Sequence, residues 1–260
     1  REWIIGRNAV MEVLQSRRRE VFKLLLATGV EEKGRVIELQ KLAASRKCPV
    51  ERVSKERLAK MGENPQGVAL EVSRYPYVNL VDITQRAKSA NEDLFVLLLD
   101  MIQNPQNLGS LLRSAEAAGV HGVVIPPHRA AEVTPAVVNS SSGASEHMLI
   151  AQANLVQAVE EFKQAGAWVV GLDGGPGSQR VQQVRLDGDI ETPARHAAGP
   201  AVIAGNDTQA QPGQNALHLG GGQLQPQHLA DAARPQADRR PHGQVRAGHG
   251  LVDRPGLAAD

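Results

Sequence analysis

The residues best suited to chemistry lie between positions 100 and 119, where a buried-strand pattern gives way to a polar loop and then to an amphipathic helix. Asn107 is expected at the start of the helix and Arg113 almost two turns later, so both side chains can reach one cleft. The loop follows the end of a predicted parallel strand, which is where open α/β sheets bind their ligands. The arginine guanidinium is planar, permanently charged and matched to a phosphate group. On these residues alone, an asparagine N-cap and an arginine on a solvated helix face remain the alternative.

Composition excludes several other classes of protein. The 260 residues hold 29 Lys and Arg against 28 Asp and Glu, and the net charge of +1 excludes a histone-like basic protein and an acidic tail protein. The longest apolar run, 94–99, is far shorter than the ~20 residues needed to cross a membrane, and we expect no secretory leader. The single cysteine, Cys48, excludes a disulfide framework and a cysteine-rich zinc site. We therefore expect a cytoplasmic protein with no metal and no membrane partner.

Apolar periodicity predicts two folded units that position Asn107 and Arg113. The first is a small α/β unit over residues 1–73, and residues 74–93 predict a linker with about one helical turn. In the second unit, residues 94–206, strands and helices alternate, which predicts a parallel sheet. Strands are expected at 21–27, 48–53, 68–72, 94–99, 122–125, 168–172 and 201–204, and helices near 10–14 and at 35–45, 108–118 and 154–165.

The last part of the chain, 207–260, has a different composition from the rest. It contains no Lys, Glu, Ile, Met, Ser, Phe, Tyr or Trp, and no helical or strand period extends beyond a few residues. Its histidines lack the compact spacing of metal ligands. The pattern predicts an aberrant or disordered tail.

Five segments, in this order, resemble the SpoU branch of the SPOUT RNA methyltransferases. Residues 107–115 fit Asn-x-Gly-x-x-x-Arg-x-Ala, the first motif of that family, after a strand ending in Leu-Asp. The resemblance covers residues 1 to about 207 and is closest to the 23S rRNA guanosine 2′-O-methyltransferases. The other segments are 5–14 and 65–72, which resemble the accessory RNA-binding domain, 140–146, which resembles the serine-rich segment, and 201–207, which resembles the start of the second methyltransferase motif.

The resemblance implies a fold and a reaction. The fold is an N-terminal α/β RNA-binding domain followed by a parallel-sheet methyltransferase domain with a C-terminal trefoil knot, through which the family typically forms homodimers. The cofactor is S-adenosylmethionine, and the methyl group goes to a ribose 2′-hydroxyl of RNA, expected to be rRNA, with tRNA as the alternative. Such a hydroxyl is a poor nucleophile near neutral pH, so it needs a base or a charge that stabilises the oxyanion.

The resemblance also assigns residues. Arg113 matches the catalytic arginine, which we interpret as a clamp that orients the target phosphate and stabilises the developing alkoxide; a proton-accepting role assisted by the RNA phosphate is the variant proposed for the family. Asn107 would hold Arg113 or the phosphate in register. The serines of 140–146 fit loop and helix caps equally well. The remaining assignments are Ile203, Gly205 and Asn206 to the cofactor, Arg7, Gln66, Ser140, Ser141, Gly143 and Glu146 to RNA, and Arg17, Arg18, Arg19, Arg46 and Lys47 as further phosphate contacts.

The chain departs from the family pattern inside the second methyltransferase motif. Where the family continues Gly-Asn-Glu-Gly-x-Gly-Leu-Ser, residues 205–211 read GNDTQAQ, and the third motif is absent. We hypothesise a reading-frame shift near codon 207, because back-translation with a one-base slide allows a Pro-Met pair at 241–242 and Met-Asp-Ser-Leu at 249–252. The alternative is a true divergent tail. Either way the knot is expected to be incomplete and cofactor binding poor, which leaves a catalytically dead RNA-binding remnant as the rival function.

Overall fold

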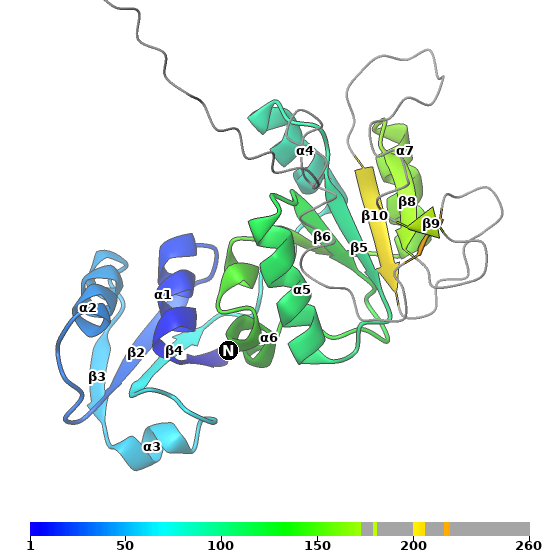
Figure 1. Cartoon of the computed structure of the whole chain (residues 1–260). Coiled ribbons are helices and arrows are strands. Elements are labelled where there is room, and N and C mark those ends of the chain that lie inside the picture. The colour runs from blue at the N-terminus through cyan, green and yellow to red at the C-terminus, as the bar shows by residue number, and fades with distance from the viewer. Residues whose placement is uncertain (173–178, 181–199, 206–215, 219–260) are drawn as a thin grey trace, which may run out of the picture.

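Two sheets organise the computed structural model, which describes residues 1–172, 179–180, 200–205 and 216–218 (Figure 1). In the N-terminal domain the strand order is β1-β4-β2-β3, with β4 antiparallel to both β1 and β2, and β3 parallel to β2. The elements of this domain are β1 (Glu2–Ile5), α1 (Arg7–Ser16), β2 (Val21–Ala27), α2 (Arg35–Ser45), β3 (Val50–Val53), α3 (Lys55–Ala59) and β4 (Val68–Val72).

Helices pack on both faces of this sheet, because successive strand residues point to opposite faces. Leu24 of β2 is fully buried in the core that also holds Leu39 of α2. Leu25, the next residue, is buried on the other face with Leu58 of α3. The small α/β unit predicted from the sequence is therefore a two-faced sheet, and its first strand, β1, was too short to show a period.

The second sheet follows the order β7-β6-β5-β10-β8-β11-β9, and every pair of neighbouring strands is parallel. This confirms the predicted parallel sheet. The last strand predicted from the sequence corresponds to β10, which lies between β5 and β8. The elements are α4 (Leu80–Ala90), β5 (Val96–Asp100), α5 (Pro105–Ala117), β6 (Gly122–Ile125), α6 (Pro135–Ser140), η1 (Ala144–Glu146), β7 (Ile150–Gln152), α7 (Leu155–Gln164), β8 (Trp168–Leu172), β9 (Gln179–Arg180), β10 (Pro200–Gly205) and β11 (Ala216–His218).

Strand β5 divides its side chains between two helical layers. Leu97 and Leu99 are buried in the core that contains α5 and α6, which continues into the N-terminal domain. Val96 and Leu98 are buried on the opposite face, with residues of α4 and α7. A continuous apolar run is what a strand covered on both faces requires, so the sequence pattern at 94–99 has its physical reason here.

The segment 74–93 is more regular than the predicted linker with about one helical turn. It contains the 11-residue helix α4, whose start is fixed by a capping box in which the Asn79 backbone N–H donates to Asp82 Oδ2 at 2.8 Å. The polar residues that suggested a linker lie on the exposed face of this helix, and Ile83 and Ala87 supply its buried face. Two buried positions in eleven were too few to reveal the helical period.

Within the ranges that the structure describes, no helix is long and apolar enough to cross a membrane. The same residues contain no group of three or more His, Cys, Asp or Glu side chains placed to hold a metal ion. Residues 207–215 and 219–260 of the predicted tail, and with them most of the expected knot, lie outside the described residues.

Candidate active site

Helix α5 begins three residues before the position predicted for it. Asn104 is the N-cap, its Oδ1 accepting from the backbone N–H groups of Gln106 at 2.7 Å and Asn107 at 3.4 Å, and Pro105 occupies the first helical position. Asn107 therefore lies in the first turn of the helix and is not its cap. Its side chain is exposed next to the end of β5, where it is free of the capping role that the alternative interpretation gave it.

Gly109 allows α5 to lie directly against α6. A Cβ atom at this position would stand 1.9 Å from Ser140 Oγ and 2.8 Å from the Ser141 backbone nitrogen, closer than atoms can approach. Ser140 Oγ donates to the Pro105 carbonyl at 3.1 Å, which ties the end of α6 to the start of α5. The glycine of the Asn-x-Gly-x-x-x-Arg motif thus sets the distance between the two helices that carry the site.

Arg113 lies one turn further along α5 and faces the segment that follows α6. The side chain is exposed, and its Nη1 donates to Ser142 Oγ at 3.4 Å. Ser142 has a φ of 55°, the left-handed conformation that glycine usually adopts after a helix. The Ser142 N–H donates to Asn139 O at 3.0 Å and the Gly143 N–H to Val138 O at 2.8 Å, the two bonds of a Schellman motif. The end of α6 therefore holds a strained serine against the candidate catalytic arginine.

Three other residues of the serine-rich segment are buried, against the expectation that they line the RNA side. Ser141 is fully buried, and its Oγ accepts from the Ser145 N–H at 3.3 Å, as a cap would. Gly143 lies against α1, where a Cβ atom would stand 2.4 Å from Glu12 Cγ. Glu146 is fully buried. The expected RNA contact is corrected to a structural role for Ser141, Gly143 and Glu146, whereas Ser140 is half-buried.

Glu146 forms the centre of a buried joint between the two domains. Arg19, at the end of the loop after α1, donates from Nε and Nη2 to the two carboxylate oxygens at 3.0 and 2.9 Å. Arg19 Nη1 also donates to Glu2 Oε2 at 2.9 Å and to the Ser73 carbonyl at 3.1 Å. Burial raises the pKa of the Glu146 carboxyl, and the neighbouring Arg19 charge offsets part of this rise. We call Arg19, Glu146 and Glu2 the interdomain joint.

Tyr75 completes the contact between the domains. Its buried hydroxyl donates to the Met148 carbonyl at 2.7 Å and accepts from Arg18 Nη1 at 2.8 Å, and burial raises the pKa of the phenol. Arg18 Nη2 donates to the Pro76 carbonyl at 3.1 Å. Arg46 donates to the carbonyl of Val13, in α1, at 3.1 Å, and to the carbonyl of Arg19, in the loop that follows α1. The assignment of Arg19 to an RNA phosphate is therefore corrected, because this side chain is buried and binds the protein itself. Arg18 and Arg46 are half-buried, and their phosphate contacts stay predictions.

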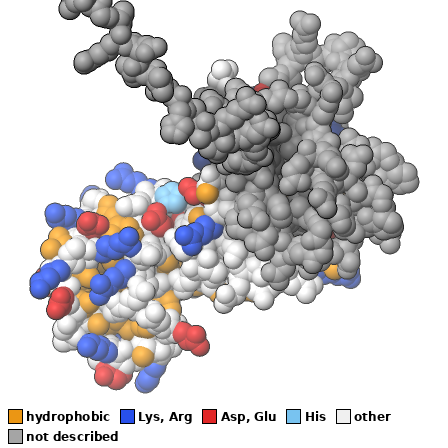
Figure 2. Space-filling view, in the orientation of Figure 1, with side chains coloured by type: hydrophobic (Ala, Val, Ile, Leu, Met, Phe, Trp, Pro, Cys, Tyr) orange, Lys and Arg blue, Asp and Glu red, His pale blue; other side chains and the backbone are white. Residues whose placement is uncertain are grey.

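Arg7 and Gln66, which the resemblance assigns to RNA, lie next to each other in the N-terminal domain. The Arg7 backbone N–H donates to Gln66 Oε1 and its Nε donates to the Gln66 carbonyl, each at 3.1 Å. Residues 1–73 carry 15 Lys and Arg against 10 Asp and Glu, a local net charge of +5. Lys and Arg side chains are spread over the visible face of this domain, interspersed with acidic ones (Figure 2).

The residues assigned to the cofactor are described in part. Ile203 and Gly205 belong to β10, and Gly205 pairs with Asp100 at the carboxyl end of β5. This edge of the sheet directly precedes the loop that leads to Asn104 and α5, so the expected cofactor end and the expected RNA end adjoin. Asn206 lies outside the described residues.

Several residues of the site were not singled out from the sequence. Asn104 followed by Pro105 is a helix-start signal, and it could have placed α5 correctly. Ser142 lies in the middle of the quoted triple serine, but only the fold shows that it is the one facing Arg113. The partner of Glu146 is 127 residues away in the sequence, and no local pattern indicates it.

Comparison with known proteins agrees with this architecture. The family described as RNA 2′-O ribose methyltransferase substrate binding matches residues 3–78, and the SpoU rRNA Methylase family matches 94–209. A protein named as TrmH family tRNA/rRNA methyltransferase YacO, from Bacillus subtilis (strain 168), is 38% identical over 192 residues, which are 73% of this chain and 75% of the relative. A TrmH family tRNA/rRNA methyltransferase of Staphylococcus saprophyticus is 36% identical over 172 residues, 65% of this chain and 68% of the relative.

Solved structures share the fold. The SpoU methyltransferase AviRb from Streptomyces viridochromogenes, in complex with AdoMet, has a TM-score of 0.68 and 22% identity, over 92% of this chain and 91% of that chain. An AdoMet-bound rRNA methyltransferase from Sinorhizobium meliloti has a TM-score of 0.65 and 18% identity, over 89% of this chain and 85% of that chain. The two matched family segments and the relative from Bacillus subtilis together establish that the chain belongs to the SpoU/TrmH family of RNA methyltransferases.

Proposed function

We propose that the active site formed by α5 and α6 transfers a methyl group from S-adenosylmethionine to a ribose 2′-hydroxyl of rRNA, with a guanosine of 23S rRNA as the target. The observation that carries this proposal is the exposed guanidinium of Arg113, held by Ser142 where the N-terminal domain meets the methyltransferase domain. The printed names of the relatives, tRNA/rRNA methyltransferases, support an RNA substrate of either kind. We place the enzyme in the cytoplasm, because its buried Cys48 fits a reducing compartment.

The chemistry asked of Arg113 is electrostatic. A guanidinium remains protonated at neutral pH, so it is poorly suited to remove a proton from the ribose hydroxyl by itself. It can bind the phosphate beside the target ribose through two parallel N–H donors and lower the energy of the alkoxide that develops on the 2′-oxygen. Asn107, one to two turns earlier on α5, supplies an exposed amide that can hold the same phosphate in register.

The described residues fit the cofactor at one edge. S-adenosylmethionine supplies an electrophilic methyl group on a sulfonium. The carboxyl ends of β5 and β10 lie side by side, with Gly205 opposite Asp100. Ligands of open parallel sheets bind at such strand ends, which supports the assignment of Ile203 and Gly205.

The test is methyl transfer to rRNA followed by chemical analysis of the product. The chain, with its reading frame restored if the present one binds no cofactor, is incubated with tritiated S-adenosylmethionine and unmodified 23S rRNA, and the labelled RNA is treated with alkali. A 2′-O-methyl group removes the nucleophile that cleaves the next phosphodiester bond, so the label should remain in alkali-resistant dinucleotides. Label found in mononucleotides would indicate base methylation and contradict the proposal.

A second function, RNA binding without methyl transfer, is favoured for the 260-residue chain by its sequence from residue 207 onward, which departs from the family motif. Here we propose that the coding DNA contains a single-base shift near codon 207 and that the chain does not bind S-adenosylmethionine at micromolar concentration. Resequencing from about codon 195 tests the first part, and calorimetric titration of the cofactor tests the second. Restoration of the frame should restore cofactor binding. It should also restore homodimer formation, because the family typically dimerises through the knot. Stop codons in the shifted frame would contradict the single-base shift. Micromolar binding of S-adenosylmethionine by the present chain would contradict the proposed loss of cofactor binding.

Ser142 gives a prediction in which stability and activity move in opposite directions. A left-handed backbone costs roughly 1–2 kcal/mol for a residue with a side chain, and Ser142→Gly removes this strain from the folded protein. Glycine also gives the unfolded chain more conformational freedom, which offsets part of the gain in stability. We expect a gain of about 0.5–1 kcal/mol, or roughly 2 °C in the melting temperature. Methyl transfer should fall about tenfold, because Arg113 loses its hydroxyl partner. Thermal unfolding and single-turnover kinetics measure the two effects. A variant that is more stable and equally active would show that Ser142 does not position Arg113.

A further inference from the structure

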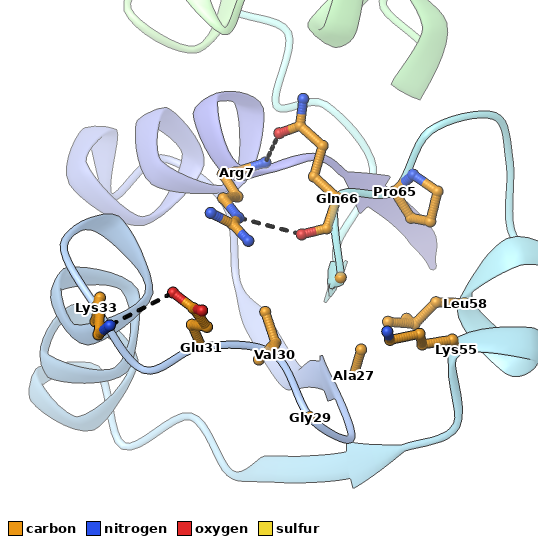
Figure 3. A pocket seen from close by; sticks show the side chains of 11 residues that line it. Arg7, Ala27, Gly29, Val30, Glu31, Lys33, Lys55, Leu58, Pro65 and Gln66 are labelled. Atoms are coloured by element: carbon orange, nitrogen blue, oxygen red, sulfur yellow. Dashed lines mark hydrogen bonds and ion pairs between the residues drawn. The ribbon is translucent and has the colours of Figure 1, made fainter.

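A pocket of about 500 Å³ in the N-terminal domain lies outside the site described above (Figure 3). It lies between the carboxyl end of β2, the loop that leads to α2, the start of α3 and the turn before β4. Its volume is within the range of about 300–1,000 Å³ that is usual for pockets that bind small organic groups. The pocket shares Arg7 and Gln66 with the RNA-binding assignment, which does not by itself account for a cavity of this volume.

The floor of the pocket is apolar and closely packed. Ala27 and Leu58 are each only 1% exposed, and the half-buried Val30 packs against the same apolar cluster (Figure 3). Gly67, with a φ of +76°, closes the floor from behind: a Cβ atom there would stand 3.2 Å from Val30 Cγ2. The Ala27 N–H donates to the Gly67 carbonyl at 2.9 Å, so the backbone of the floor is fixed by the sheet.

The rim of the pocket carries positive charge. The Arg7 guanidinium is held through Nε by the Gln66 carbonyl at 3.1 Å, and its terminal nitrogens face the pocket (Figure 3). Lys33 and Lys55 line the rim on either side. Glu31 is the one anion among the lining residues; it pairs with Lys33 at 3.8 Å, with the two side chains 79% and 83% exposed, so this pair is weak. The lining residues therefore keep a net charge of +2, from three cations and one anion.

We propose that this pocket binds one unpaired nucleotide of the substrate RNA. The base would insert against Ala27, Val30 and Leu58 and stack on the planar guanidinium of Arg7, a platform that proteins use for splayed-out bases. Lys33 and Lys55 would contact the flanking phosphates. A base within a duplex cannot enter such a pocket, so the N-terminal domain selects a loop or bulge. The inference rests on the proposed function only in that the RNA is a methylation substrate.

The test measures RNA binding by the full chain without cofactor, using fluorescence anisotropy. The probes are a labelled single-stranded RNA of about ten nucleotides and the same strand annealed to its complement. Val30→Trp fills the pocket without changing charge, and it should weaken single-strand binding at least tenfold while duplex binding stays the same. Arg7→Lys keeps the charge but loses the plane, and it should weaken single-strand binding several-fold. Lys33→Ala with Lys55→Ala should also lower the salt slope by about 1.4, since roughly 0.7 is lost for each phosphate contact to a single strand.

The matched control is Lys41→Ala with Lys60→Ala, which removes the same charge from exposed positions outside the pocket and should change affinity less than threefold. Circular dichroism checks that each variant is folded; if Val30→Trp is not, Arg7→Lys decides alone. Unchanged single-strand binding by both Val30→Trp and Arg7→Lys would overturn the nucleotide pocket, and loss from the lysine pair alone would reduce the site to a phosphate contact. The readout is RNA binding in the absence of cofactor, so a failure of the methylation proposal leaves this test intact.

Discussion

Replacing Arg113 with lysine is expected to lower the rate constant of methyl transfer by two to three orders of magnitude, with little change in RNA affinity. Lysine keeps the positive charge but offers a single flexible ammonium in place of a planar fork, so the phosphate and the developing alkoxide are no longer held together. Removal of one donor that stabilises an oxyanion typically costs about 10²–10³ in rate. Single-turnover kinetics with saturating cofactor measure this step, on whichever chain transfers methyl groups: the present one or the one with its frame restored.

Two controls make the Arg113 experiment decisive. Arg57→Lys changes an exposed arginine of α3 that pairs with Glu51 at 3.1 Å, and it should leave the rate unchanged. Asn107→Ala removes the amide on the same helix and should slow transfer less than Arg113→Lys does. Because the rate is compared at equal bound RNA, an Arg113→Lys enzyme that works within threefold of the parent would end the assignment of Arg113 as the catalytic arginine. Loss of RNA binding instead of rate would make it a docking residue.

The second large effect is expected at the interdomain joint. Arg19→Ala leaves the fully buried Glu146 carboxylate without its two charged hydrogen bonds, and breaking a buried ion pair in this way costs about 3–5 kcal/mol. Replacing both partners, Arg19→Met with Glu146→Leu, removes the stranded charge and should recover more than half of that loss. Urea unfolding measures the stability of the three chains. Equal destabilisation by the single and the double variant would contradict the buried pair as the source.

The same pair gives a pH dependence whose sign follows from Glu146. Burial raises the pKa of this carboxyl in the folded protein, and removal of Arg19 raises it further. A raised folded pKa contributes stability that is present below the unfolded value of about 4.3 and is lost as the pH rises through the folded pKa. The Arg19→Ala chain should therefore be destabilised much less at pH 5 than at pH 8. A destabilisation that is equal at the two pH values would contradict an ionised, unpaired Glu146.

Much of the fold could be predicted from the sequence where apolar runs are continuous and bounded by glycine, proline or charged residues. The strands predicted at 21–27, 68–72, 122–125 and 168–172 have the same bounds in the structure. Elements with only a few residues, such as β1 and β7, were missed because two alternations do not make a period. Helix α4 was missed for a different reason, since its exposed face is so polar that it has the composition of a linker.

The candidate site was predictable in type but not in assembly. Asn107 and Arg113 stand out from spacing and from family resemblance, because both lie on one helix. The role of Glu146 could not be predicted, since a glutamate in this segment is as consistent with an RNA contact as with a buried ion pair. The distinction depends on Arg19, which reaches it only after the N-terminal domain has packed against α6 and η1. Long-range pairing of this kind leaves no signal in a single sequence.

The position of β10 in the sheet has a consequence for biosynthesis. This strand pairs with β5 on one side and β8 on the other, although it follows both in the chain by many residues. When residues 1–172 have left the ribosome, β7, β6 and β5 can form a three-stranded sheet, but the free edge of β5 and the whole of β8 have no partner strand yet. Both strands are apolar and expose unpaired backbone groups, the condition under which nascent chains associate wrongly. Folding of the catalytic domain must wait for Gly205 to emerge, so slow translation before that point should increase the demand for chaperones, and fast translation should relieve it.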